Sequence, residues 1–150
     1  MPEQETLKRA REDEREGKSP STQAGEFVRE EIHHVREGKH GARSPQQAIA
    51  IGLSKARRAG VKLSPPKGSA SLRKKAAQDS KAGAKGSARK TSAKRSRAVE
   101  GALQRESHTT ASRKALSGQA KKAAVKRGKE SRKLAAAKAA RTRKAALPIR

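Results

Sequence analysis

The sequence has no cysteine, one aromatic residue and no long apolar run. Without cysteine, disulfides, thiolate metal sites and cysteine nucleophiles are excluded. Without Tyr or Trp, the chain lacks the stacking platforms of single-strand and RNA-binding modules. The longest apolar run, residues 48–53, is far shorter than the roughly 20 residues of a membrane-spanning helix. The first residues are charged and lack the apolar stretch of a secretory signal. We therefore expect a cytoplasmic protein with no membrane partner.

Acidic residues are scarce in the second half of the chain. Residues 1–63 carry 13 Lys/Arg and 10 Asp/Glu, whereas residues 64–150 carry 26 Lys/Arg and 4 Asp/Glu. The net charges are therefore +3 and +22. A segment this cationic repels itself, and it gains most from a dense polyanion whose condensed counterions it can displace.

Bulky apolar residues are also unevenly distributed. Nine lie between residues 20 and 63, and only eight are scattered over the 87 residues from 64 onward. Low hydrophobicity combined with high net charge is typical of segments that cannot offset their ordering entropy. The expected fold is therefore all-α, with a short helical hairpin as a head and a largely disordered, conditionally helical basic tail.

The head is expected to follow a charged N-terminal segment, residues 1–18. Within it, residues 3–16 predict a solvated helix with no apolar face, stabilised by weak ion pairs along the helix. Residues 19–63 predict the hairpin. Its first helix begins at Ser19-Pro20, a capping residue followed by proline, and ends at Gly38, which places it at about 20–37. Its apolar residues follow at helical spacing and form one stripe (Ala24, Phe27, Val28, Ile32 and Val35).

The second helix of the hairpin has the clearest boundary signals. Ser44-Pro45-Gln46-Gln47 is a capping box with proline in its favoured place, and Gly60 stands where a left-handed terminal residue belongs. Between them, Ile49 and Leu53 lie on one face. A second copy could pair through Phe27, Ile32, Ile49 and Leu53 as a homodimer; the alternative is a hairpin packed on itself.

Ser64-Pro65-Pro66 marks the start of the tail, residues 64–150. Glycines interrupt the Ala-Lys stretches of residues 67–95, which we therefore expect to be disordered. Three conditional helices are predicted further on, near 94–106, 110–127 and 130–146. Alanine favours these helices and lysine repulsion opposes them, so phosphate neutralisation should raise their helicity.

No residue pattern predicts a metal site, a cofactor or an enzyme. His33, His34 and His40 lie close in sequence, but adjacent helical residues point about 100° apart and no carboxylate completes an obvious set. His108 is isolated. Glu30, Glu31 and Glu37 could act as acids or bases, but no pocket is evident that would perturb them.

The basic residues predict sequence-independent nucleic-acid binding through phosphates, because no base-reading element is evident. Duplex DNA is favoured over RNA. At the end of the second helix the cations also complement the helix dipole, which is an alternative reason for their presence. The candidate residues are Lys55, Arg57, Arg58, Lys62, Arg73, Lys74, Lys75, Arg89, Lys90, Lys94, Arg95, Arg97, Arg113, Lys114, Lys121, Lys122, Lys126, Arg127, Arg132, Lys133, Arg141, Arg143 and Lys144.

Two resemblances accompany this interpretation. The runs Ala120–Ala124 and Lys138–Arg141 resemble the C-terminal tails of linker histones and bacterial histone-like proteins. Residues 36–40 and 44–60 are similar to a motif in small uncharacterised bacterial proteins with basic tails, some labelled DNA-binding or plasmid stabilisation. The resemblances imply a nucleoid or plasmid setting and no catalysis. Two alternatives stay open: an interaction protein of plasmid maintenance whose tail only localises it to DNA, and an RNA- or ribosome-associated protein.

Overall fold

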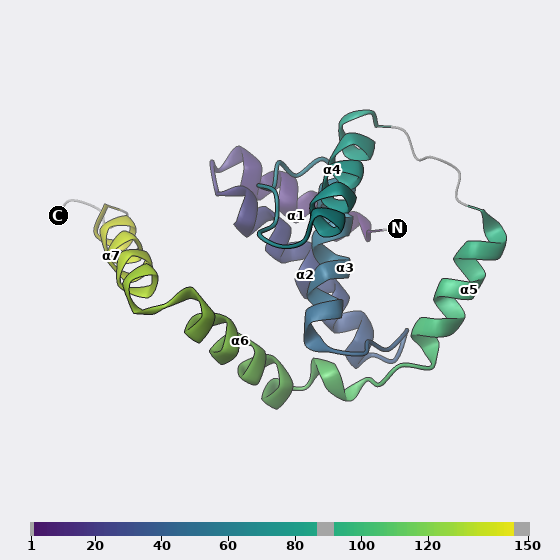
Figure 1. The fold of residues 1–150 in the computed structure, drawn as a ribbon. Helices are drawn as coiled ribbons and strands as arrows, with labels where there is room; N and C mark the ends of the chain where they lie inside the picture. Colours follow the sequence, from purple (N-terminus) through teal and green to yellow (C-terminus); the bar gives the residue numbers. More distant parts are fainter. Residues whose placement is uncertain (1, 87–91, 146–150) are drawn as a thin grey trace. The chain divides into compact units, whose positions relative to one another are not determined.

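The structure is a computed structural model that describes residues 2–86 and 92–145, and these residues form α-helices and one short 3-10 helix (Figure 1). The all-α expectation is confirmed. The chain divides into two compact units, Met1–Ser112 and Arg113–Arg150. The elements are α1 (Gln4–Arg15), α2 (Pro20–Arg36), α3 (Pro45–Arg58), α4 (Ala70–Ala84), α5 (Ala93–Gln104), η1 (Thr109–Ala111), α6 (Arg113–Arg127) and α7 (Lys129–Ala145).

Helices α2 and α3 form the expected hairpin, and both begin at the expected caps. The Ser19 hydroxyl accepts a hydrogen bond from the Thr22 backbone N–H, and the Ser44 hydroxyl accepts one from Gln47. Gly38 follows α2 with a φ of 76° and Gly60 follows α3 with a φ of 98°, a backbone region that favours glycine. Capping and a terminal glycine therefore define both helices.

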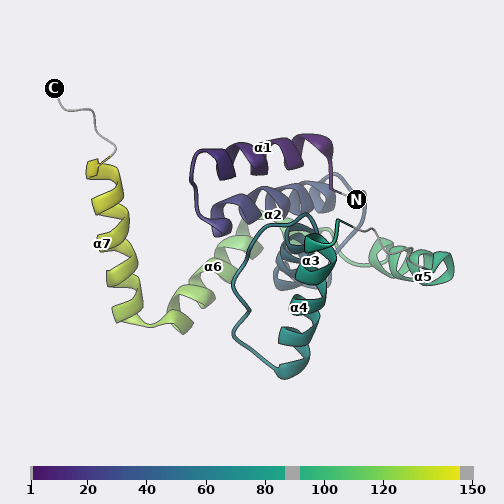
Figure 2. The same cartoon turned by 90° about the horizontal axis from the view of Figure 1, so that it is seen from above.

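Helix α1 packs along α2 (Figure 2). Thr6 and Ala10 are buried, and Leu7 packs against a cluster around Phe27. The expectation of a helix without an apolar face was wrong, because small side chains every three to four residues are enough for close helix contact. An ion pair between Arg9 and Glu26, at 3.2 Å, also joins the two helices.

Helix α4 lies in a segment that was expected to be disordered. The Ser69 hydroxyl caps it by accepting from the Leu72 N–H, and the helix packs on α3. Ala76 and Asp79 are buried, and the Asp79 carboxylate accepts a 2.5 Å hydrogen bond from the Ser54 hydroxyl of α3. The prediction of disorder is therefore wrong for residues 70–84. Residues 87–91 lie outside the described part of the chain.

The chain returns to the hairpin at residues 103–111. The Gly41 N–H donates to the Leu103 carbonyl at 2.8 Å, and the Ala42 N–H donates to the Ser107 carbonyl at 3.0 Å. Ala111 is buried in a second core cluster with Val35, Ala42 and Ala48. The first compact unit therefore continues past residue 63, the expected end of the head, and ends at Ser112.

Helices α6 and α7 make up the described part of the second unit and meet at Gly128, whose φ is 79°. They match the helices expected at 110–127 and 130–146, with residue 146 outside the described range, and α5 matches the one expected at 94–106. The largely disordered tail is thus not seen in the residues that the structure describes. None of the described helices is long and apolar enough to cross a membrane.

Candidate functional site

The second unit presents its basic residues to solvent on two helices, α6 and α7, whose residues up to 144 are exposed or half-buried. No residue of α6 is buried, and residues 129–144 are all exposed. Glu130 is the one acidic residue of 113–150, and it lies 3.6 Å from Lys133. These helices therefore have no apolar stripe for a core but offer a dense array of exposed cations. This array includes eleven of the candidate nucleic-acid-binding residues: Arg113, Lys114, Lys121, Lys122, Lys126, Arg127, Arg132, Lys133, Arg141, Arg143 and Lys144.

The cations of α7 are concentrated on one side of that helix. At 3.6 residues per turn, five of its seven cations, Lys129, Arg132, Lys133, Arg143 and Lys144, fall within an arc of about 120°. Arg141 lies about 60° beyond this arc, and Lys138 lies on the opposite side of the helix. The cations of α6 are spread around its whole circumference by the same reckoning. Helix α7 thus presents the more continuous cationic face, and alanines make up half of its residues other than those five cations.

The candidate cations of the first unit differ in exposure. Arg73 and Lys74 on α4, and Lys94, Arg95 and Arg97 on α5, are exposed. Lys75 is exposed but lies 3.3 Å from the buried Asp79 carboxylate. Arg89 and Lys90 fall outside the described residues.

The cationic patch expected at the end of α3 is only partly on the surface. The Lys55 side chain is 16% exposed, and its Nζ lies 3.2 Å from Glu30 and 2.7 Å from Glu31. Arg57 is 9% exposed and donates to the Ser64 carbonyl. Both residues therefore hold the fold together, which leaves Arg58 and Lys62 as the exposed cations of this group.

The residues considered for a homodimer are largely covered by their own chain. Phe27 is 0% exposed, packed in the cluster that also contains Ala10 and Ala56. Ile32, Ile49 and Leu53 are half-buried. Helix α1, which the sequence did not place against the hairpin, takes part of the position assigned to a second copy.

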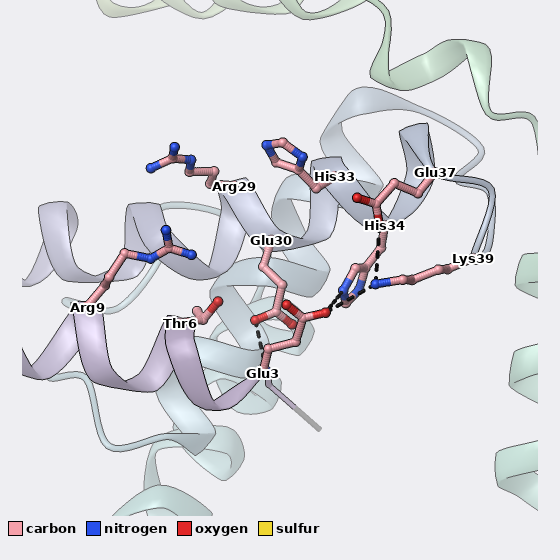
Figure 3. A pocket seen from close by; sticks show the side chains of 9 residues that line it. All are labelled: Glu3, Thr6, Arg9, Arg29, Glu30, His33, His34, Glu37 and Lys39. Carbon is pink, nitrogen blue, oxygen red and sulfur yellow. Dashed lines mark hydrogen bonds and ion pairs between the residues drawn. The ribbon is translucent and has the colours of Figure 1, made fainter.

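A polar pocket of about 210 Å³ opens between α1 and the C-terminal half of α2 (Figure 3). Glu3, His34 and Lys39 meet at one side of it, with Glu3 Oε1 2.9 Å from His34 Nε2 and 3.2 Å from Lys39 Nζ. The hydrogen bonds from His34 and Lys39 lower the pKa of Glu3. Burial raises the pKa of Glu30, but hydrogen bonds from Thr6, the Glu3 N–H and Lys55 outweigh burial and lower it.

Beside this pocket, Glu31, His34 and His40 each offer one ligand atom, and these atoms lie within 4.8 Å of one another. No carboxylate partner was predicted for the histidines, because His40 lies in the connection after α2 and no periodic pattern predicts that this connection brings it close to Glu31. The spacing of Glu31 and His34, three residues apart on one helix, was the available signal. Two imidazoles and a carboxylate are a donor set that suits zinc.

Comparison with known proteins gives one match. No curated protein and no solved structure matches the chain significantly. Residues 15–68, which include α2 and α3, match the model of a family of unknown function, DUF6496.

Proposed function

We propose that this protein binds nucleic acid, with duplex DNA as the favoured partner, by neutralising phosphates without reading sequence. The observation that carries the proposal is the pair of helices α6 and α7, whose basic side chains are exposed and whose surfaces lack a core-facing stripe. A helix with many exposed cations and no core-facing stripe is poorly stabilised by its own chain. A polyanion relieves that repulsion and is bound through the release of its counterions.

The expected strength of the salt dependence follows from the number of contacts. Helix α7 has 17 residues and is about 25 Å long, a length over which duplex DNA carries about 15 phosphate charges. If α6 and α7 together engage about eight phosphates, the log–log slope of affinity against salt should be near −7. Binding should then weaken by about 10⁴-fold between 50 and 200 mM salt.

The test is a salt titration of binding to a short mixed-sequence duplex, using the full chain and two variants of equal net charge. The first variant is K121Q/K122Q/K126Q on α6. The second is K8Q/R11Q/R15Q on α1, where the three exposed cations stand beside Glu12, Asp13 and Glu14. The α6 variant should make the slope shallower by about 3, since each lost phosphate contact changes it by about 0.9. The α1 variant should leave it unchanged.

An equal decrease of the salt slope in the two variants would show that net charge alone matters and would contradict a binding role for the second unit. Affinity that does not change between 50 and 200 mM salt would contradict phosphate neutralisation altogether. A duplex of unrelated sequence should bind equally well. Competition with a folded RNA then separates the two partners: we expect a competing duplex to displace the labelled one at a lower concentration than the RNA does.

A further inference from the structure

Three side chains of the first unit converge in a way that phosphate binding does not use. We propose that Glu31, His34 and His40 bind one divalent transition-metal ion, with Zn²⁺ the ion that fits best. Zinc takes imidazole nitrogen and carboxylate oxygen at about 2.0–2.2 Å, usually in a tetrahedral arrangement. Three protein ligands leave one position for water or another donor.

The arrangement is close to what such a site needs. Glu31 and His34 are three residues apart on α2 and share a face of that helix, while His40 comes back from the α2–α3 connection. His40 Nε2 lies 3.2 Å from Glu31 Oε1. The edge of a zinc tetrahedron is about 3.3 Å for these bond lengths. An ion could therefore join this pair with little movement, and the ligand atom of His34 lies within 4.8 Å of both.

Both histidines are held from outside in the way that ligating histidines are. His40 Nδ1 is 3.0 Å from the Gly41 carbonyl, and donation to that oxygen places the lone pair on Nε2, the atom that faces Glu31. His34 Nε2 is 2.9 Å from the Glu3 carboxylate, so an ion held by this ring would bind Nδ1, with Glu3 fixing the ring from the other side. A carbonyl or carboxylate behind the imidazole fixes its tautomer and raises its basicity as a ligand.

The Glu31 carboxylate has the capacity for a further cation. Its side chain is 1% exposed, and neither of its oxygens receives an aligned hydrogen bond from the described residues. Lys55 Nζ lies 2.7 Å from Oε2, and Oε1 faces His40. Lys55 also contacts Glu30, so one ammonium serves two nearly buried carboxylates. A dication shared by Glu31 and the two histidines would supply the missing positive charge.

A bound ion would tie the α2–α3 connection to α2. That connection also carries the Gly41 and Ala42 N–H groups that hold residues 103 and 107. The ion would therefore strengthen the attachment of the returning segment and raise the unfolding temperature of the first unit, since a ligand that binds only the native state stabilises it.

The experiment uses Zn²⁺ alone, added to the metal-free full chain, with calorimetric titration and thermal unfolding as readouts. We expect one Zn²⁺ per chain and a rise in the unfolding midpoint that EDTA reverses. H34Q and H40Q should each weaken binding at least tenfold. H33Q is the matched control: His33 is an adjacent, exposed histidine of the same helix, points away from the group around Glu3 in Figure 3, and its loss should leave affinity unchanged.

A second measurement on the unaltered protein guards against variants that fail to fold. Zinc should shift the imidazole NMR signals of His34 and His40 and leave those of His33 and His108 in place. Co²⁺ should give the visible absorption of a tetrahedral ion. Binding that H33Q weakens as much as H40Q, equal shifts at all four histidines, or no binding at 100 µM Zn²⁺ would each overturn the site.

Discussion

Two glycines in the hairpin give opposite predictions for the same substitution. Gly52, in the middle of α3, faces α2 so closely that a Cβ built on it would lie 2.7 Å from Val28 Cα and 3.0 Å from the Phe27 carbonyl oxygen. Ordinary carbon–carbon contacts are about 3.5–4.0 Å, so Gly52→Ala would require α3 to move away from α2 by about 1 Å. Gly25, in the interior of α2, has nothing within 4 Å of the same position.

The expected energies follow from these distances. Alanine in place of glycine favours a helix by about 1 kcal/mol, and at Gly25 nothing opposes that gain. At Gly52 overpacking costs about 1–3 kcal/mol, and backbone atoms, which cannot rotate away, put the cost at the upper end of that range. We therefore expect G25A to stabilise the protein by about 0.5–1 kcal/mol and G52A to destabilise it by about 1–2 kcal/mol.

The assay is urea unfolding followed by circular dichroism at 222 nm and by the NMR signals of the buried Phe27 ring. The Phe27 signals report on the first unit alone, and the urea dependence should keep its slope in both variants if only stability changes. A G52A variant as stable as G25A would refute the close crossing of α2 and α3. It would also remove the basis for placing Lys55 beside Glu30 and Glu31.

Three other substitutions test further contacts. Lys55→Met should destabilise the first unit by about 3 kcal/mol or more in urea unfolding, because it leaves the nearly buried carboxylates of Glu30 and Glu31 without their ammonium partner. The control K8M, on the exposed face of α1, should have little effect. Asp79→Ala should lower the stability of the first unit by about 1.5–3 kcal/mol and abolish the hydrogen-exchange protection of α4, while α2 and α3 stay protected. Protection that persists in α4 would contradict its anchoring to Ser54. Gly118→Ala, at an open position of α6, should raise the helical circular dichroism signal measured without duplex DNA and reduce the further increase that DNA causes. If DNA increases the signal of neither the unaltered protein nor the variant, folding is not coupled to binding.

The hairpin was predictable because its signals are local. Ser19 and Ser44 stand at the N-caps, glycine ends both helices, and one apolar stripe runs along α2. These features act within a few residues and need no knowledge of the rest of the chain. The helices of the second unit were predictable for the same reason, since alanine content is a property of the segment itself.

The packing of α4 and of residues 103–111 was not predictable from such signals. Asp79 is a single acid in a basic segment, and it stabilises the packing of α4 through its hydrogen bond with Ser54, a residue 25 positions earlier. Backbone groups attach Gly41 and Ala42 to residues 103 and 107, and the Arg43–Glu106 ion pair beside them joins residues 63 positions apart, so no local pattern indicates the contact. The approach of His40 to Glu31 and His34 depends on the same connection. Composition therefore identified the cationic segment correctly but placed the end of the folded unit too early in the chain.

The position of Ala111 decides where this chain can be cut for dissection. A fragment ending at residue 63 would leave Val35, Ala42 and Ala48 uncovered and would strip the Gly41 and Ala42 amides of their acceptors. Loss of activity in such a fragment would report damage to the folded part, and it would say nothing about the role of the basic segment. Cleavage after Ser112 keeps every one of these contacts, so a protease site inserted there separates the two units while leaving the first one whole.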